Sequence, residues 1–82
     1  FPDSNSIFVY PNPFDHVLYM NQISDSPVLI TLFDIQGRIL LEKVINNTNE
    51  IDLSGIILKE GIYMMRMSCE DFITYETLYK KH

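Results

Sequence analysis

Two histidines and one cysteine are the side chains in this sequence best suited to metal binding or nucleophilic chemistry. His16 follows Asp15, His82 is the terminal residue, and two acidic residues follow Cys69. Protein zinc sites combine histidines and cysteines at short spacings, and this sequence contains no such pair. A reactive thiol needs a basic neighbour to stabilise its thiolate, which acidic neighbours do not provide. We therefore expect no metal site, and we expect Cys69 to be a small buried hydrophobic residue.

Sequence patterns typical of hydrolases and nucleotide-binding proteins are also missing. No G-x-S-x-G motif is present that could place a serine beside His16 in a catalytic triad. The three glycines are too few and too dispersed for a phosphate-binding loop. The acidic residues are scattered and do not follow the spacing of a calcium-binding loop. The sequence therefore predicts a protein that is not an enzyme and that needs no cofactor.

The composition indicates a small folded domain. The chain has 82 residues, of which 46% are hydrophobic, so a single domain over residues 1–82 is expected rather than a disordered segment. A net charge of −5 disfavours binding to nucleic acid, whose phosphates would be repelled. The longest apolar run, residues 28–33, is far too short for a transmembrane segment. Because the sequence begins FPDSNS without a methionine, we expect it to be excised from a longer protein.

The elements that would position these side chains are β-strands. Segments rich in β-branched and aromatic residues recur about every 8–12 residues, with turn residues between them and no sustained helical period. About seven such strands are expected, at residues 7–10, 15–20, 28–34, 38–45, 49–53, 62–69 and 72–80. In the sixth segment, Tyr63, Met65, Met67 and Cys69 form one row of alternating residues that is expected to face a core. All the methionines, including Met64, are expected to fill that core. This pattern predicts an all-β fold, an immunoglobulin-like antiparallel β-sandwich with Greek-key topology.

Two local motifs support this fold. In FDIQGRIL, Asp34 can accept hydrogen bonds from the backbone ahead of it, and Gly37 can adopt positive φ, so a type I turn closed by a G1 bulge is expected. In EGIY, Tyr63 lies just after the expected start of the sixth strand, where such sandwiches place a tyrosine corner. Its hydroxyl would then bond to the backbone across the preceding loop, with Gly61 allowing the close approach.

The segment VYPNPF contains two prolines directly after an apolar, strand-like run. Pro11 and Pro13 have no N–H group to donate to a sheet, and the preceding residues, Tyr10 and Asn12, are biased toward extended backbone. The segment is therefore expected to be a stiff, extended crossover that protects a sheet edge. Asn12 is expected to hold the bend through local hydrogen bonds.

The sequence resembles the C-terminal sorting domain of proteins exported by the type IX, or Por, secretion system of Bacteroidetes bacteria. The resemblance is carried, in order, by VYPNPF, FDIQGRIL, IDLSGI, GIYMMRM and the basic end YKKH, and it extends from about Val9 to the last residue. It implies an immunoglobulin-like domain without catalytic activity, attached behind an effector protein. The family's motif positions are matched here by Tyr10, Pro11, Asn12, Pro13, Gly37, Arg38, Gly61, Tyr63, Lys80 and Lys81.

The resemblance also implies the partners and the location of the protein. The partners would be the sorting machinery of the outer membrane and an upstream cargo domain in the same chain. The cargo would cross the periplasm and the outer membrane, and it would be secreted or held at the cell surface, often after removal of the domain.

Three features depart from the family's pattern. Residues 56–60 make one loop longer and more apolar, SCEDFI lacks the customary glycine, and the final strand has two tyrosines and ends in His82.

Several of these residues leave more than one interpretation open. Arg38 is a solvated charge, a contact for the machinery, or an internal bond partner of a carboxylate or carbonyl. Lys80 and Lys81 either protect an edge strand or form an exposed tag. The apolar residues 56–58 either cap an open end of the sandwich or form an interaction patch. If the last strand lies at a sheet edge, the machinery could read it by strand addition.

Two other functions fit a small β-sandwich. One is an accessory module that binds carbohydrate or protein, for which Tyr19, Tyr75 and Tyr79 could form an aromatic platform. The other is a structural spacer that stabilises a neighbouring catalytic domain. Export of a fused reporter would distinguish the sorting domain from both alternatives.

Overall fold

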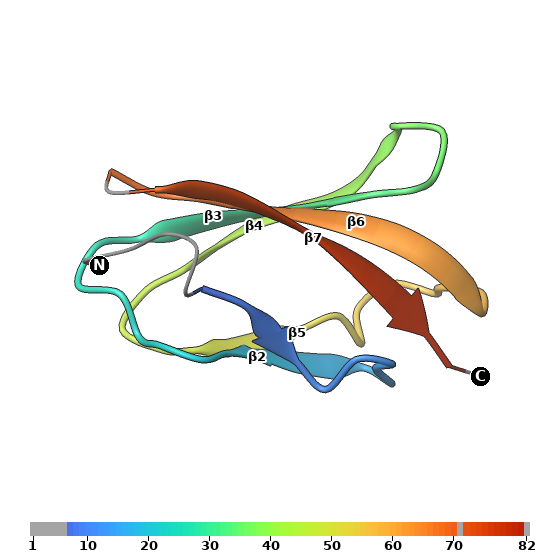
Figure 1. Ribbon diagram of the computed structural model, residues 1–82, viewed down its shortest axis with the longest axis horizontal. Helices are drawn as coiled ribbons and strands as arrows, with labels where there is room; N and C mark the ends of the chain where they lie inside the picture. The colour runs from blue at the N-terminus through green and yellow to red at the C-terminus, as the bar shows by residue number, and fades with distance from the viewer. Residues whose placement is uncertain (1–6, 71, 82) are drawn as a thin grey trace.

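The chain folds into two antiparallel β-sheets that lie face to face, as Figure 1 shows. The structure, a computed structural model, describes residues 7–70 and 72–81. Within these residues it contains seven strands and no helix, so no helix there could cross a membrane. The strands are β1 (Val9–Tyr10), β2 (Val17–Met20), β3 (Val28–Phe33), β4 (Ile39–Ile45), β5 (Glu50–Asp52), β6 (Gly61–Ser68) and β7 (Ile73–Lys80). The predicted all-β class is confirmed, and each predicted strand is present close to its expected bounds.

The smaller sheet has the strand order β1-β2-β5, and the larger sheet has the order β4-β3-β6-β7. After the β3–β4 hairpin, the chain crosses to the smaller sheet for β5 and then returns to place β6 beside β3. This non-sequential pairing is the long connection of a Greek key. With seven strands in two antiparallel sheets, the fold is compatible with an immunoglobulin-like sandwich.

The core lies between the two sheets and is lined by one side of each strand. Its buried hydrophobic residues are Ile7, Val9, Phe14, Leu18, Met20, Val28, Ile30, Leu32, Ile45, Ile51, Leu53, Met65, Met67, Phe72 and Leu78. Because successive side chains of a strand point to opposite faces, the burial of Met65 and Met67 fixes which residues of β6 point outward. The inward row predicted for the sixth strand is therefore confirmed.

Two predictions about the core need correction. Met64 lies on the outer side of β6 and is 42% exposed, so it does not fill the core as the other methionines do. Cys69 packs against the core but is only half-buried, because it follows the last residue of β6 at the margin of the sandwich.

Candidate functional site

The motif positions are dispersed along the chain, but they lie together at one end of the sandwich. Antiparallel pairing places Gly61 beside Lys80, and an isolated bridge places Phe14 beside Lys80 as well. The β3–β4 hairpin lies at this same end, on the right in Figure 1, because Phe33 pairs with Met64 near the start of β6. We call this the motif end; it carries residues 10–14, 34–38, 59–63 and 79–81.

The β3–β4 hairpin at the motif end is organised by the Asp34 carboxylate. Its Oδ1 accepts hydrogen bonds from the backbone N–H groups of Gln36 and Arg38, both at 2.9 Å. Its Oδ2 accepts a hydrogen bond from Arg38 Nε at 2.7 Å. The Gly37 N–H donates to the Asp34 carbonyl at 3.0 Å, and Gly37 has a φ of +85°. The turn predicted from FDIQGRIL, including the positive φ that favours glycine, is confirmed.

These hydrogen bonds stabilise the charged form of Asp34. The backbone N–H of Arg38 contributes most to lowering the pKa of this carboxyl, and the Arg38 side chain and the Gln36 N–H add to the effect, while partial burial opposes it. Of the interpretations open for Arg38, the structure shows the internal bond to a carboxylate. The Arg38 side chain is still 73% exposed, so the guanidinium also remains accessible from solvent.

Tyr63 forms the tyrosine corner that the sequence predicts. Its hydroxyl donates a hydrogen bond to the carbonyl of Lys59, four residues upstream, at 2.8 Å. Gly61 lies between these two residues with a φ of +147°, a value that residues with a side chain rarely adopt. The expected close approach at Gly61 is wrong, because no atom lies within 4 Å of the position that a Cβ would take. The bond ties the start of β6 to the loop that crosses from the smaller sheet.

That loop, residues 53–60, covers the core at the motif end. Ile56 and Leu58 pack against the core, whereas Ile57 is completely exposed. The Ile56 N–H donates to the Leu53 carbonyl at 3.3 Å, which begins the turn of the loop. Of the two interpretations of this apolar stretch, capping is confirmed for Ile56 and Leu58, and Ile57 alone is available for contacts with another molecule.

Asn12 connects the motif end to the last strand. Its Nδ2 donates to the Thr77 carbonyl at 3.0 Å, and its Oδ1 accepts from the Tyr79 N–H at 2.8 Å. Both backbone groups lie on the outer edge of β7, away from β6, so the side-chain amide takes the place of a neighbouring strand. An asparagine side chain can do this because it carries a donor and an acceptor on one planar group.

Two expectations for VYPNPF are therefore wrong. Asn12 bonds to a strand that is 65 to 67 positions away and not to its own loop. The segment is also not extended throughout: the bend that was expected at Asn12 is present, at residues 12 and 13, and the peptide bonds before Pro11 and Pro13 are cis. After the bend, Phe14 pairs with Lys80 of β7.

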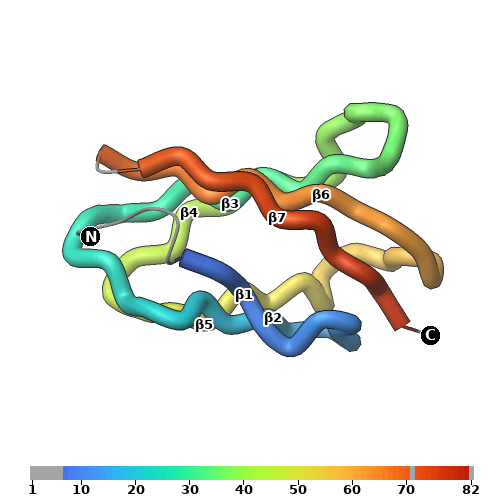
Figure 2. Tube along the Cα trace, in the orientation of Figure 1, coloured from blue at the N-terminus to red at the C-terminus, as the bar shows by residue number. Residues whose placement is uncertain are grey.

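Phe14 continues the contact with β7 through its backbone. Its N–H donates to the Tyr79 carbonyl at 2.8 Å, and its carbonyl accepts from the Lys81 N–H at 2.9 Å. The Phe14 side chain is fully buried, which anchors the segment in the core. Figure 2 shows the segment after β1 meeting the C-terminal end of β7. Strand addition to this part of β7 is blocked while residues 12–14 are in place, because its outward backbone groups are already paired.

Lys80 and Lys81 have different environments although they are adjacent. The Lys80 side chain is only 9% exposed; its ammonium donates to the Lys81 carbonyl and lies 3.9 Å from Asp15 Oδ1. Lys80 points inward because it lies on the same side of β7 as the buried Leu78. An exposed tag made of both lysines is therefore excluded, and only Lys81 is exposed.

Glu76 joins the two sheets at a place that the sequence analysis missed. It lies on the inner side of β7, and its Oε1 accepts a hydrogen bond from the Val9 N–H of β1 at 3.3 Å. Burial raises the pKa of the Glu76 carboxyl above its ordinary value, and the hydrogen bond from Val9 acts in the opposite direction. The sequence could have predicted this position. Alternation along β7 places Glu76 and Lys80 on the inward side with Leu78, where charged groups need partners.

The tyrosines that could have formed a carbohydrate-binding platform lie on opposite faces of the molecule. Tyr19 is on the outer side of the smaller sheet, whereas Tyr75 and Tyr79 are on the outer side of the larger sheet. Tyr19 instead lies against Tyr10, with the ring centres 5.8 Å apart. The prediction of one platform is therefore wrong, and the main feature that favoured a carbohydrate-binding module is lost.

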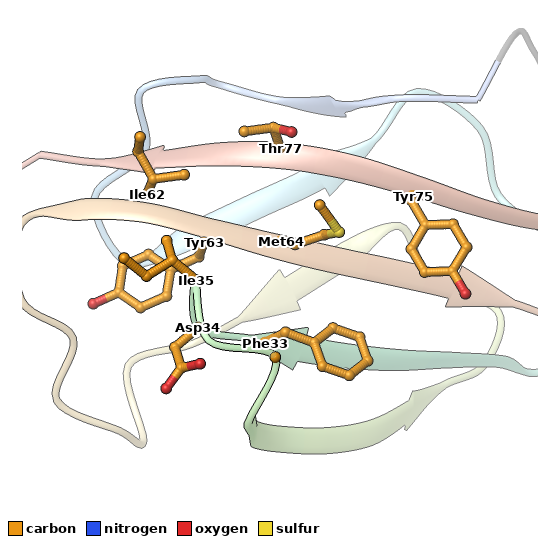
Figure 3. A pocket seen from close by; sticks show the side chains of 9 residues that line it. Phe33, Asp34, Ile35, Ile62, Tyr63, Met64, Tyr75 and Thr77 are labelled. Carbon is orange, nitrogen blue, oxygen red and sulfur yellow. The ribbon is translucent and has the colours of Figure 1, made fainter.

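An apolar groove of about 480 Å³ lies on the outer side of the larger sheet, next to the hairpin. Figure 3 shows Phe33, Met64 and Tyr75 along this groove, with Ile35 of the hairpin at one end, beside Tyr63. Such a surface offers contacts to apolar groups of another molecule. Over residues 7–70 and 72–81, no group of histidine, cysteine or acidic side chains is arranged to hold a metal ion.

Comparison with known proteins agrees with this architecture. Residues 8–81 match the family described as the secretion system C-terminal sorting domain. A search of curated proteins gave no match. The matched range contains every strand and every motif position, and it covers nearly the whole chain. The chain therefore belongs to the family of secretion system C-terminal sorting domains.

Proposed function

We propose that residues 1–82 form a single, non-catalytic domain that directs an upstream cargo protein across the outer membrane through the type IX secretion system. The observation that carries this proposal is the family match over residues 8–81. Sorting tails of this family mark proteins that are secreted or displayed on the cell surface. The motif end, with its hydrogen-bonded loops, is suited to binding another protein, which is what a sorting signal requires.

We further propose that the machinery contacts the motif end. A signal that is read on many cargo proteins needs a surface whose shape does not depend on the cargo. The hydrogen bonds of Asn12, Asp34 and Tyr63 tie the loops of the motif end to the backbone at three places, which supports such a surface. Around these fixed residues, Lys81 and the guanidinium of Arg38 remain exposed and offer positive charge to a partner.

A transfer experiment tests the sorting function. Residues 1–82 are fused behind a fluorescent protein that is targeted to the periplasm of a Bacteroidetes host. We expect fluorescence outside the cells or on their surface in the wild-type strain, and only in the periplasm of a strain that lacks the secretion system. The same reporter without the chain is the control. Equal retention of the fusion in both strains would contradict the proposal.

A matched pair of substitutions in the same fusion tests the motif end. Lys81→Gln and Asn46→Asp each lower the net charge by one, at an exposed position. Lys81 lies at the motif end, whereas Asn46 follows β4 at the opposite end of the sandwich. We expect export to fall with Lys81→Gln and to remain unchanged with Asn46→Asp. Equal export of both variants would exclude Lys81 as a contact for the machinery.

A further inference from the structure

The outer side of the larger sheet is rich in exposed hydrophobic side chains. We define the outer-face patch as Ile39, Val44, Ile62, Met64, Ile73 and Tyr75, which are between 42% and 61% exposed. They come from β4, β6 and β7 and point away from the core. Val44 and the residues of β6 and β7 alternate with inward residues, whereas Ile39 pairs with the outward Phe33 across a shift in register. A soluble monomer rarely exposes so many large hydrophobic residues on one face.

The size of this surface suits a stable interface. Together with Ile35, which is 77% exposed at the hairpin tip, the outer-face patch offers on the order of 800 Å² of side-chain surface. A standard protein–protein interface takes about 800 Å² from each partner. The exposed surface of these residues is therefore comparable in size to one side of such an interface.

The charges on this face are balanced, which suits contact with an identical face. Among the outward side chains of the four strands, the charged residues are Glu42 and Arg66. The Thr31 hydroxyl donates to Glu42 Oε2 at 3.4 Å and accepts from the Arg66 guanidinium at 3.3 Å, and that guanidinium also lies over the Phe33 ring. With a net charge of −5, two copies of the chain repel each other over other parts of their surface, but this face is neutral.

The β3–β4 hairpin gives the face a shape that can fit onto itself. Figure 1 shows the hairpin leaving the plane of the larger sheet on its outer side, at the motif end. Ile35 in this hairpin lies at one end of the groove that Phe33 and Met64 also line. If a two-fold axis places two hairpins at opposite ends of an interface, each hairpin packs against the far end of the partner's sheet. Val44 and Ile73 lie at that far end.

We propose that a second copy of this chain covers the outer-face patch. The two larger sheets would pack face to face around a two-fold axis, as sheets do within a sandwich. The interface would be isologous, so that the same residues contribute from both copies. This association does not depend on the sorting function, because it follows from the area, charge and shape of one face.

Sedimentation equilibrium of the 82-residue chain, from about 1 µM to about 1 mM, tests this proposal. We expect a concentration-dependent equilibrium between monomer and dimer. Met64→Lys and Ile73→Lys each place a charge in the outer-face patch, and each is expected to raise the dissociation constant by about tenfold or more. Tyr19→Lys is the matched control, because it adds the same charge on the outer side of the smaller sheet. Circular dichroism verifies that each variant is folded.

All three substitutions reduce the net negative charge, so general repulsion between copies cannot explain a loss of dimer. A chain that stays monomeric at the highest concentration would overturn the proposal, and the patch would then belong to a different partner. A dimer that survives both Met64→Lys and Ile73→Lys would overturn it too. The proposal would also be overturned if Tyr19→Lys weakened the dimer as strongly as Met64→Lys and Ile73→Lys do.

Discussion

Asn12 and Tyr79 lie 67 positions apart in the chain, yet the Asn12 Oδ1 accepts a hydrogen bond from the Tyr79 N–H at 2.8 Å. The Nδ2 of the same amide donates to the Thr77 carbonyl at 3.0 Å. One side chain thus supplies the two bonds that a neighbouring strand would supply to β7. This explains an asparagine between two prolines: Pro11 and Pro13 have no N–H group, and the amide provides the donor that they lack.

Replacement of Asn12 should loosen the end of the last strand. Asn12→Ala removes both hydrogen bonds to β7, and we expect the free energy of unfolding to fall by about 1–2 kcal/mol. Urea denaturation measures this change, and amide hydrogen exchange should show faster exchange at Tyr79. Asn46→Ala, at the far end of the sandwich, is the control and should change stability by less than about 0.5 kcal/mol. Equal effects of the two substitutions would show that the Asn12 amide does not stabilise β7.

The tyrosine corner gives a second stability prediction. Tyr63→Phe removes the hydroxyl that donates to the Lys59 carbonyl and leaves the ring in place, so we expect a loss of about 1 kcal/mol. Tyr75→Phe removes a hydroxyl from an exposed ring on the neighbouring strand and should leave the stability nearly unchanged. Thermal unfolding compares the two variants. A Tyr63→Phe variant as stable as the wild type would mean that water replaces the corner hydrogen bond without loss.

The features that were predicted correctly from the sequence depend on residues that are close together in the chain. The hairpin bond joins Asp34 to Arg38, and the corner bond joins Tyr63 to Lys59, both across four positions. The type of a turn follows from such local residues, because glycine and aspartate have specific backbone preferences. Strand alternation is local in the same sense, so the inward row of β6 was also predictable.

The contacts that were missed or misplaced depend on which sheet edges meet in the folded chain. Asn12 reaches Tyr79 only because the segment after β1 returns to the outer edge of β7. Val9 reaches Glu76 because β1 in one sheet lies against β7 in the other. No local preference of these residues specifies a partner 67 positions away. Alternation along β7 does place Lys80 on the inward side, and it could have excluded the exposed lysine pair.

Gly37 and Gly55 form a matched pair for testing the hairpin. Gly37 has a φ of +85°, and no atom lies within 4 Å of the position that a Cβ would take. The cost of Gly37→Ala therefore comes from the backbone conformation alone, and we expect about 1 kcal/mol of destabilisation. Gly55 also has open space around its Cβ position but does not have a positive φ, so Gly55→Ala should be neutral or slightly stabilising. Thermal unfolding distinguishes the two, and equal midpoints would contradict the requirement for glycine at position 37.

Glu76 should make the protein less stable as the pH rises. Burial raises the pKa of its carboxyl in the folded state above the ordinary value of 4.5, so the folded protein binds this proton more tightly than the unfolded chain does. The stabilisation is fully present below about pH 4.5 and is lost as the pH rises through the folded-state pKa. Glu76→Gln keeps an oxygen acceptor for the Val9 N–H but cannot ionise. We expect urea denaturation to show this variant gaining stability relative to the wild type as the pH rises.

Asp34 should contribute in the opposite direction. The hydrogen bonds from Arg38 and Gln36 lower the pKa of its carboxyl below the ordinary value of 3.8, so this stabilisation is present above about pH 3.8 and is lost as the pH falls through the folded-state pKa. Asp34→Asn keeps the Oδ1 acceptor for the two backbone N–H groups and removes the charge. The difference in unfolding free energy between the wild type and Asp34→Asn should therefore shrink as the pH falls. If it is constant from neutral to strongly acidic pH, the charge of Asp34 does not stabilise the hairpin. The stability that Glu76→Gln gains relative to the wild type grows as the pH rises, whereas the stability that Asp34→Asn lacks relative to the wild type shrinks as the pH falls. One series of urea denaturations across pH therefore measures the two carboxyls separately.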